Sequence, residues 1–334
     1  MLLIEPGNRK TMYALAAGLE DLAARSEASS PEQAAAYRLE SLTILTSALR
    51  YLPTGELSAG DTELYVAMKM LQGFLLDKLG KADEALAIFH EGLETAKSAY
   101  LADDSQPYLF NHAGRLSRMI ADVHISRNDW AKALENYEFS LKWIKDYRGN
   151  PKLSARTLRA GEAIYTVRIG RALHKLGRKT EAMTRIADGL NLHFDYAAAY
   201  SNDASILIYS PEILSTASAY FAESGKTGPG REMWQKFAGE VSVFLERNPN
   251  DAQMSGLLAF ARESEADLIS GYSSESNLIS KHDRAALRAA ITAYSSAREI
   301  RQRLAGKHSA DAAGRLEHKI ALCRSSIPNL SGSR

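Results

Sequence analysis

The sequence holds a single cysteine, Cys323, in 334 residues, so one chain cannot form an internal disulfide. Cysteine usage of this kind is compatible with a reducing cytosol, and we expect a cytoplasmic protein or the tail of a larger membrane-linked one. No run of about 18 uninterrupted apolar residues occurs, so a membrane span is not expected. The opening MLLIEPGN turns polar too early for a signal peptide.

Sequence motifs of catalytic and metal sites are also missing. His90-Glu91 lacks the second histidine of HExxH, and no serine stands in GxSxG. Gly225-Lys226-Thr227 matches the end of a phosphate-binding loop, but Tyr220 stands where that loop needs a glycine. Cys323 has no evident activating base. We therefore expect no enzyme, no cofactor and no metal site.

What is present is a helical pattern. In the stretch KLGKADEALAIFHEGL (78–93), Ala85, Phe89 and Gly92 fall at i, i+4 and i+7, which places them on one helical face. A second helix can approach closely only over small residues, and Phe89 fills the space beside them. The spacing therefore predicts the second helix of an antiparallel hairpin.

The same small–large–small face recurs three times along the chain. The equivalent triplets are Ala133, Tyr137 and Ser140; Ala182, Ile186 and Gly189; and Ala290, Tyr294 and Ala297. Small residues also stand twelve positions before the first three alanines, at Gly73, Ala121 and Gly170. The first alanines are 48 and 49 residues apart, so the pattern predicts a repeated hairpin of that length.

These triplets resemble the second helix of the tetratricopeptide repeat, although the usual repeat is shorter, at about 34 residues. The resemblance implies an all-α, right-handed superhelical solenoid of antiparallel hairpins without β-strands, with the first helix of each hairpin lining a concave groove. We predict one solenoid over 1–327 and a disordered tail at 328–334. Its parts are clear hairpins at 61–98, 107–147 and 155–193, degenerate repeats at 195–247 and 252–304, and a capping helix at 309–326. We also expect Ser210-Pro211 to break a helix and 225–230 to form a flexible turn.

Both ends of the chain carry a further resemblance. The segment 289–323, AAITAYSSAREIRQRLAGKHSADAAGRLEHKIALC, is similar to the repeat tails of some bacterial serine/threonine protein kinases. That similarity implies a regulatory or docking role, because no kinase motif is present. Residues 2–8 read like the end of an earlier repeat, so we expect possible self-association through the N-terminal repeat.

Charge is distributed unevenly. Residues 1–110 hold nine Lys and Arg against sixteen Asp and Glu, whereas residues 111–185 hold sixteen against seven. The remaining residues hold sixteen against seventeen, and the whole chain has a formal net charge of +1. The basic middle either steers an acidic partner to one place or is a solvated face balanced by the acidic first third.

Counting outward from the small residues places six side chains toward the predicted groove. They are Arg115, Arg118 and Asp122 in one hairpin, and Arg168, Arg171 and Lys175 in the next. We therefore predict a non-catalytic protein-interaction scaffold or regulatory docking module that binds an acidic or phosphorylated peptide or protein segment in this basic groove. The alternative is a nucleic-acid or phospho-ligand binder that uses the basic middle. Overall neutrality and the lack of aromatic residues among the arginines make nucleic acid the weaker hypothesis.

Overall fold

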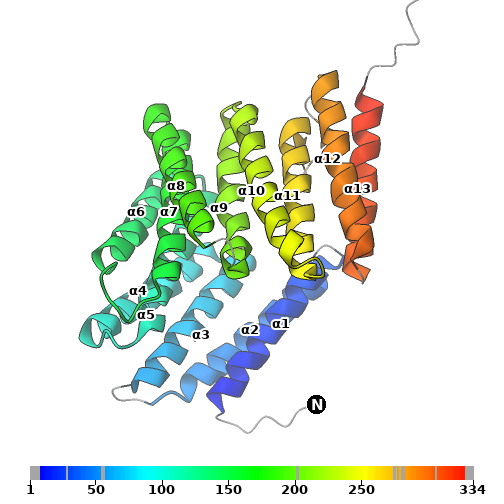
Figure 1. Cartoon of the computed structure of the whole chain (residues 1–334). Coiled ribbons are helices and arrows are strands. Elements are labelled where there is room, and N and C mark those ends of the chain that lie inside the picture. The colour runs from blue at the N-terminus through cyan, green and yellow to red at the C-terminus, as the bar shows by residue number, and fades with distance from the viewer. Residues whose placement is uncertain are drawn as a thin grey trace, which may run out of the picture. The chain divides into compact units, whose positions relative to one another are not determined.

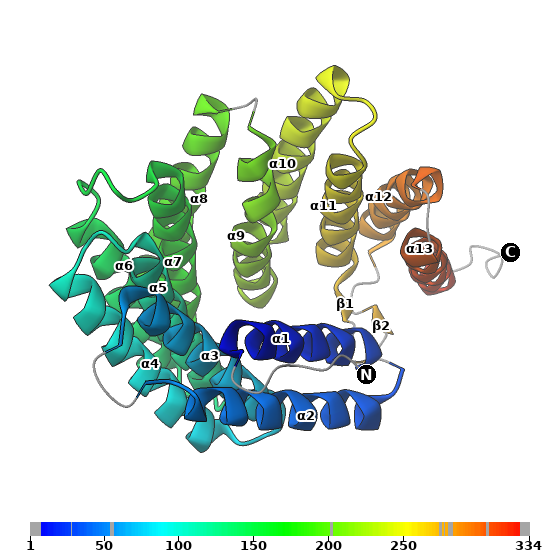
Figure 2. The same cartoon turned by 90° about the horizontal axis from the view of Figure 1, so that it is seen from below.

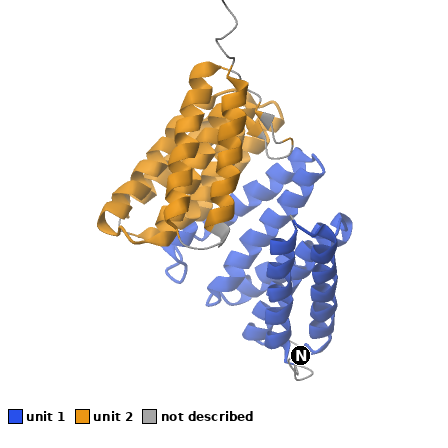
Figure 3. Ribbon diagram, turned by 90° about the vertical axis from the view of Figure 1, so that its right-hand side faces the viewer, with its two compact units in different colours: residues 1–158 blue, residues 159–334 orange. Residues whose placement is uncertain are grey.

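The computed structural model describes residues 8–27, 29–53, 57–200, 203–273, 276, 278–279, 283–304 and 307–327. Within these residues the chain forms thirteen α-helices and one short β-ribbon (Figure 1). The helices fall into two compact units, 1–158 and 159–334, coloured separately in Figure 3. In neither unit is a described helix both long enough and apolar enough to cross a membrane.

Unit 1 is a stack of helical hairpins. Its helices are α1 (Arg9–Ser26), α2 (Pro31–Arg50), α3 (Ala59–Lys78), α4 (Ala82–Ala102), α5 (Pro107–Ser126) and α6 (Trp130–Asp146). Each helix packs on the next one along the chain, and α3 also packs on both α1 and α5. The first helices of successive hairpins therefore form one layer.

Unit 2 continues the same order of elements. It contains most of α7 (Ala155–Lys175), followed by α8 (Lys179–Ala199), α9 (Ala204–Glu223), α10 (Thr227–Arg247), α11 (Ala252–Ser270), α12 (Arg284–Arg303) and α13 (Lys307–Ser326). From α8 to α13 each helix again packs on the next one along the chain, and the first helices α9 and α11 touch each other. The predicted all-α solenoid class is confirmed.

The expectation that no strand forms is wrong at one place. Between α11 and α12, β1 (Tyr272–Ser273) pairs antiparallel with β2 (Leu278–Ile279), with Tyr272 opposite Ile279. β1 contacts α11 and β2 contacts α13, so the ribbon lies between these two helices (Figure 2). The connection between α11 and α12 thus contains local backbone pairing.

In three hairpins, a small residue on the first helix faces a large residue sixteen positions later on the second helix. A Cβ built on Gly73 would lie 2.4 Å from Cε1 of Phe89, and one built on Gly170 would lie 2.8 Å from Cγ1 of Ile186. Real side chains essentially never approach this closely, so glycine is required for the helices to meet. In unit 2 the pair Ser218 and Trp234 has the same separation, and the indole N–H donates to Ser218 Oγ at 3.1 Å.

The turns inside four hairpins repeat with the same period. Each has one residue with a left-handed backbone, and the next residue donates its N–H to the carbonyl five positions earlier at 2.8–2.9 Å. The left-handed residues are Gly80, Asn128, Gly177 and Gly225. Their spacing of 48 or 49 residues matches that of the second-helix triplets, so turn and packing face belong to one repeated unit.

The structure corrects the interpretation of 225–230 as a flexible turn. Helix α10 begins at Thr227, and Pro229 stands in its first turn, where a backbone N–H is not needed. Gly230 then serves as the small residue of this hairpin: an added Cβ would lie 2.5 Å from Leu268 Cδ2. A fourth copy of the repeat therefore follows Ala182 after 48 residues.

Pro211 does not break its helix either, because α9 continues through it from Ala204 to Glu223. The predicted N-terminal repeat remnant, residues 2–8, lies outside the described residues except for Asn8, and the predicted disordered tail, residues 328–334, lies wholly outside them. The Asn8 side chain accepts from the Thr11 N–H at 3.1 Å and caps α1. The right-handed superhelix and the single solenoid over 1–327 remain predictions.

Candidate functional site

The three residues predicted to bind ligand in unit 1 lie on α5. Arg115 is exposed and Arg118 is half-buried, while Asp122 accepts a hydrogen bond of 2.9 Å from the Tyr137 hydroxyl on α6. Burial raises the pKa of Asp77 on α3, and the nearby charge of Asp122 raises it further. The surface shared by α3 and α5 therefore carries two carboxylates beside its arginines and is less basic than the sequence suggested.

The three predicted cations of unit 2 share one face of α7, and α9 supplies acids opposite them. Arg168 Nη2 lies 2.9 Å from Glu212 Oε1, and Arg171 Nη2 lies 2.8 Å from Glu223 Oε1. Lys175 Nζ reaches the same Glu223 oxygen at 3.1 Å. Two glutamates thus offset most of the repulsion that three neighbouring cations would otherwise have.

We call this group of ion pairs the Arg–Glu ladder; it consists of Arg168, Arg171, Lys175, Glu212 and Glu223. It determines which interactions an acidic ligand has to replace. Burial alone would raise the pKa of Glu223, but hydrogen bonds from Arg171 and then Lys175 hold it below its usual value. An acidic group would therefore have to displace an ionised glutamate from the cations. Exposed ion pairs contribute only about 0–1 kcal/mol each, so a bidentate carboxylate or phosphate can compete with them.

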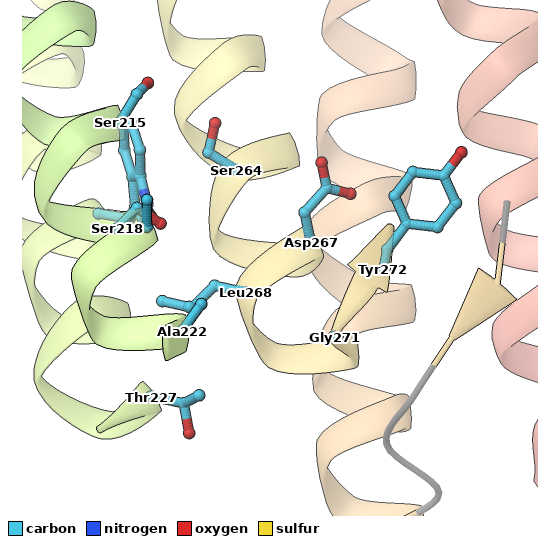
Figure 4. Close-up of a pocket in the computed structure, with 11 residues that line it drawn as sticks. Ser215, Ser218, Ala222, Thr227, Ser264, Asp267, Leu268, Gly271 and Tyr272 are labelled. Carbon is cyan, nitrogen blue, oxygen red and sulfur yellow. Dashed lines mark hydrogen bonds between the residues drawn. The ribbon is translucent and has the colours of Figure 1, made fainter. Parts of the chain in front are cut away.

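A pocket of about 400 Å³ lies beyond the Arg–Glu ladder, between α9, α10, α11 and β1 (Figure 4). Its walls carry four serine or threonine hydroxyl groups, one carboxylate, one indole and one phenol ring. These belong to Ser215, Ser218, Thr227, Ser264, Asp267, Trp234 and Tyr272. The ladder lies on α7 and α9, and most residues that line the pocket lie on α9 and α11. Because these are first helices, we call the surface that they share the first-helix face of unit 2.

The repeat itself places two walls of this pocket. Ser218 occupies the small position that faces Trp234, and the indole hydrogen bond to its hydroxyl fixes both groups. At the other side α11 ends at Gly271, whose φ of 64° is left-handed and turns the chain into β1. Tyr272 follows directly and reaches the pocket wall, as Figure 4 shows. Gly271 is thus the residue that allows the ribbon to line the pocket.

Asp267, the carboxylate of the pocket, is held by residues from α12 and α13. Lys319 Nζ lies 2.8 Å from Asp267 Oδ1 and 2.8 Å from Glu263 Oε1, and the Tyr294 hydroxyl donates to Asp267 at 2.5 Å. The ammonium of Lys319 also lies 4.3 Å from the ring centre of Tyr272. One cation from α13 therefore contacts two walls of the pocket.

Burial shapes the protonation of this group. It raises the pKa of Asp267, an effect that the neighbouring Lys319 partly opposes. Burial lowers the pKa of Lys319, but Asp267 and Glu263 outweigh it and leave that pKa raised. The lysine is therefore charged at neutral pH and supports the ionised form of Asp267.

The lining favours one class of ligand group. Hydroxyls donate and accept, Asp267 only accepts when ionised, and none of the described lining residues is Lys or Arg. A phosphate would meet a carboxylate without a compensating cation among these lining residues. A neutral polar or hydrogen-bond-donating side chain fits the pocket better, with its hydrocarbon part against Trp234 and Tyr272.

Sequence reasoning did not identify this pocket. Ser218 had a usable signal, because it precedes Gly230 by the same twelve residues that separate Gly73 from Ala85. Tyr272 had no such signal, because no sequence pattern predicts the β-ribbon that positions it. The six predicted residues remain a prediction as ligand contacts.

The described residues contain no group of three or more His, Cys, Asp or Glu side chains that could hold a metal ion. Cys323 is fully buried on α13, and burial, together with the charge of Asp267, raises the pKa of its thiol to about 11. At neutral pH this thiol is protonated, which is the unreactive form.

No model of a known protein family matches the sequence, and no curated protein matches it either. Solved structures with a similar chain course include the nuclear import adaptor Nro1 of S. pombe, with a TM-score of 0.43 and 11% identity over 92% of this chain and 99% of that one. Another is BtubC of P. vanneervenii, with a TM-score of 0.36 and 13% identity over 98% and 96% of the two chains. Likenesses this distant say nothing about a ligand or partner.

Proposed function

We propose that the chain is a non-catalytic interaction scaffold that binds a peptide or protein segment along the first-helix face of unit 2. The observation that carries the proposal is the pocket between α9 and α11. The resemblance to the tetratricopeptide repeat implies that first helices such as these line the ligand-binding groove. The neighbouring Arg–Glu ladder supplies groups of both charges. A segment bound there inserts one side chain into the pocket and makes polar contacts along α7 and α9.

The ladder changes the ligand expected from the sequence. Because Glu212 and Glu223 already face Arg168, Arg171 and Lys175, a strongly acidic segment gains less than a free basic groove would give it. A segment with one acidic group and a polar anchor side chain fits both features. Charge matching still decides orientation, because the wrong end of the segment would place like charges together.

The assignment of the chain to a repeat class rests on the repeated hairpin. A hairpin with a left-handed turn and a small residue facing a large one recurs at 48 or 49 residues. This supports placing the chain with long tetratricopeptide-like repeats, and the similarity of 289–323 to kinase repeat tails supports a docking role in signalling. Both assignments belong to the proposal, as do a cytoplasmic site of action and self-association through the N-terminal repeat.

The test is selection of peptides from a random display library on the full chain, followed by anisotropy titration of the selected peptides. Ser215→Trp fills the pocket from an exposed position on α9, so it should weaken binding at least about tenfold. The matched control is Thr184→Trp, an equally exposed position on the second helix α8, which should leave binding unchanged. Peptides that bind the Ser215 variant as tightly as the parent protein would overturn the proposal, as would the absence of any selected peptide.

A second series of variants examines the charge of the ligand. Arg168→Glu with Arg171→Glu should abolish binding of a peptide with an acidic group, whereas Glu212→Gln with Glu223→Gln should strengthen it by removing the competing carboxylates. Opposite effects from neighbouring substitutions separate recognition from unfolding, provided that circular dichroism remains helical. Binding of nucleic acid that falls steeply with salt and ignores sequence would instead favour the alternative function of the basic middle.

A further inference from the structure

A second cavity of about 490 Å³ lies in unit 2 where α10 ends, α11 begins and α12 ends. Its apolar side is formed by Leu258 of α11 and by Ile300 and Leu304 at the end of α12. Each of these three side chains is only partly buried. The cavity therefore keeps aliphatic surface in contact with solvent, and covering that surface would be favourable.

The polar side of this cavity is positively charged. It carries Asn250, Ser255 and Arg303, and Arg303 is exposed. Among the described residues no carboxylate forms an ion pair with this guanidinium. Asp251 follows the lining residue Asn250 in the sequence, but its carboxylate accepts a hydrogen bond of 2.9 Å from the Met254 N–H and caps α11. The guanidinium of Arg303 is thus available to an external anion.

We infer that this cavity binds an amphipathic carboxylate, meaning a branched aliphatic or aromatic group joined to a single carboxylate. The hydrocarbon part lies against Leu258, Ile300 and Leu304. The carboxylate lies at Arg303, where a guanidinium can donate two parallel hydrogen bonds, and the amide of Asn250 and the hydroxyl of Ser255 supply further donors.

The charge on the polar side of the cavity favours a carboxylate over a phosphate. One exposed guanidinium balances one negative charge, which matches a carboxylate and leaves a phosphate dianion half-neutralised. A cation would meet Arg303 and is disfavoured by repulsion. The volume lies in the range of ligand pockets, about 300–1,000 Å³, so an aromatic acid fits with room for the first atoms of a longer chain.

Two sources present this chemistry: a free small carboxylate, and the C-terminal residue of a partner peptide with an apolar side chain. The site is independent of the pocket between α9 and α11, because the two cavities share no lining residue. Its failure would leave the proposed scaffold function unaffected.

The experiment is a methyl NMR titration of the full chain with two matched pairs of probes. The first pair is phenylbutyrate and phenylbutanol; the second is a short peptide ending in leucine with a free carboxylate and the same peptide amidated. We expect the acids to shift the methyl signals of Leu258, Ile300 and Leu304, and each neutral partner to bind about tenfold more weakly. A response to phenylbutyrate alone identifies a small-molecule site, and a stronger response to the peptide identifies a chain terminus.

Variants locate the binding. Arg303→Gln should weaken the acids about tenfold and leave the neutral probes unchanged, whereas Arg315→Gln, an exposed arginine on α13, should change neither. Ser255→Trp should remove binding of all four probes by filling the cavity. Equal affinity for acid and neutral probes, shifts that persist in the Ser255 variant, or no shift of these methyl signals would overturn the inference.

Discussion

The ring of Phe89 occupies the space that a β-carbon on Gly73 would need, since that atom would lie 2.4 Å from Cε1 and 2.6 Å from Cδ1. Gly73 and Phe89 belong to the two helices of one hairpin, α3 and α4. The close approach of these helices therefore depends on the absence of one methyl group. The same relationship recurs at Gly170 and Ile186.

Gly73→Ala should lower the free energy of unfolding by about 1–3 kcal/mol, because the buried ring has to move in a packed core. The matched control is Gly18→Ala in α1, where an added Cβ would meet nothing within 4 Å. That substitution should stabilise the protein by about 0.5–1 kcal/mol through helix propensity. Urea unfolding followed by circular dichroism measures both, and equal effects at the two glycines would contradict the packing argument.

The hairpin turn gives a second test. Gly177 has a φ of 79°, and no atom lies within 4 Å of an added Cβ, so only backbone conformation opposes a side chain there. Gly177→Ala should cost about 1–2 kcal/mol. Gly149→Ala, also in open space but without a left-handed backbone, should cost much less. If both substitutions shift the urea midpoint equally, the left-handed turn does not limit stability.

Much of this architecture could be predicted from sequence because closely packed helices require small residues at fixed positions, and that spacing is visible in the sequence. Small residues at fixed spacing, as at Gly73 and Ala85, mark where helices meet whatever the rest of the chain does. The repeat at Gly230 was missed because GKTGPG has the composition of a loop and because Phe237 replaces the expected small residue. There the helix forms anyway, since Trp234 and Phe237 are fully buried in unit 2.

The candidate site was less predictable because its interactions are distant in sequence. Glu212 and Glu223 lie 44 and 52 residues after the arginines they face, and the expected break at Pro211 concealed the helix that carries them. Asp267 is likewise 52 residues from Lys319. Helical periodicity shows which residues share a face, but it does not show which residues of another helix lie opposite them.

The contact between Lys319 and Asp267 leads to a third prediction, on how α13 supports the pocket. Lys319→Met should leave Asp267 and Glu263 without their cation and lower the free energy of unfolding by about 1–3 kcal/mol. Adding Asp267→Asn should restore part of the loss, because the neutral amide no longer needs a cation. A double-mutant cycle in urea measures the coupling, and simple additivity of the two substitutions would show that the pair contributes nothing.

Glu240 on α10 gives the fourth prediction, a dependence of stability on pH. Its Oε2 is buried without a hydrogen-bond partner among the described residues, and burial raises the pKa of the carboxyl to about 7, an effect that Lys236 partly opposes. Because the pKa in the folded protein exceeds that of the unfolded chain, the protonated group favours folding. This contribution is complete below the ordinary pKa of 4.5 and is lost as pH rises through 7.

The buried His193 and the half-buried His112 act in the opposite direction and must be separated from Glu240. Burial lowers the pKa of His193 and of His112 to about 4, so both cost stability as pH falls below their ordinary value of 6.5. Glu240→Gln removes only the carboxyl contribution. The variant should therefore be more stable than the parent at pH 8.5 and nearly equal to it at pH 4, with the difference growing between about pH 4.5 and pH 7 and levelling off above pH 7. Urea midpoints of both proteins across this range provide the measurement, and a difference that does not change with pH would show that Glu240 titrates normally.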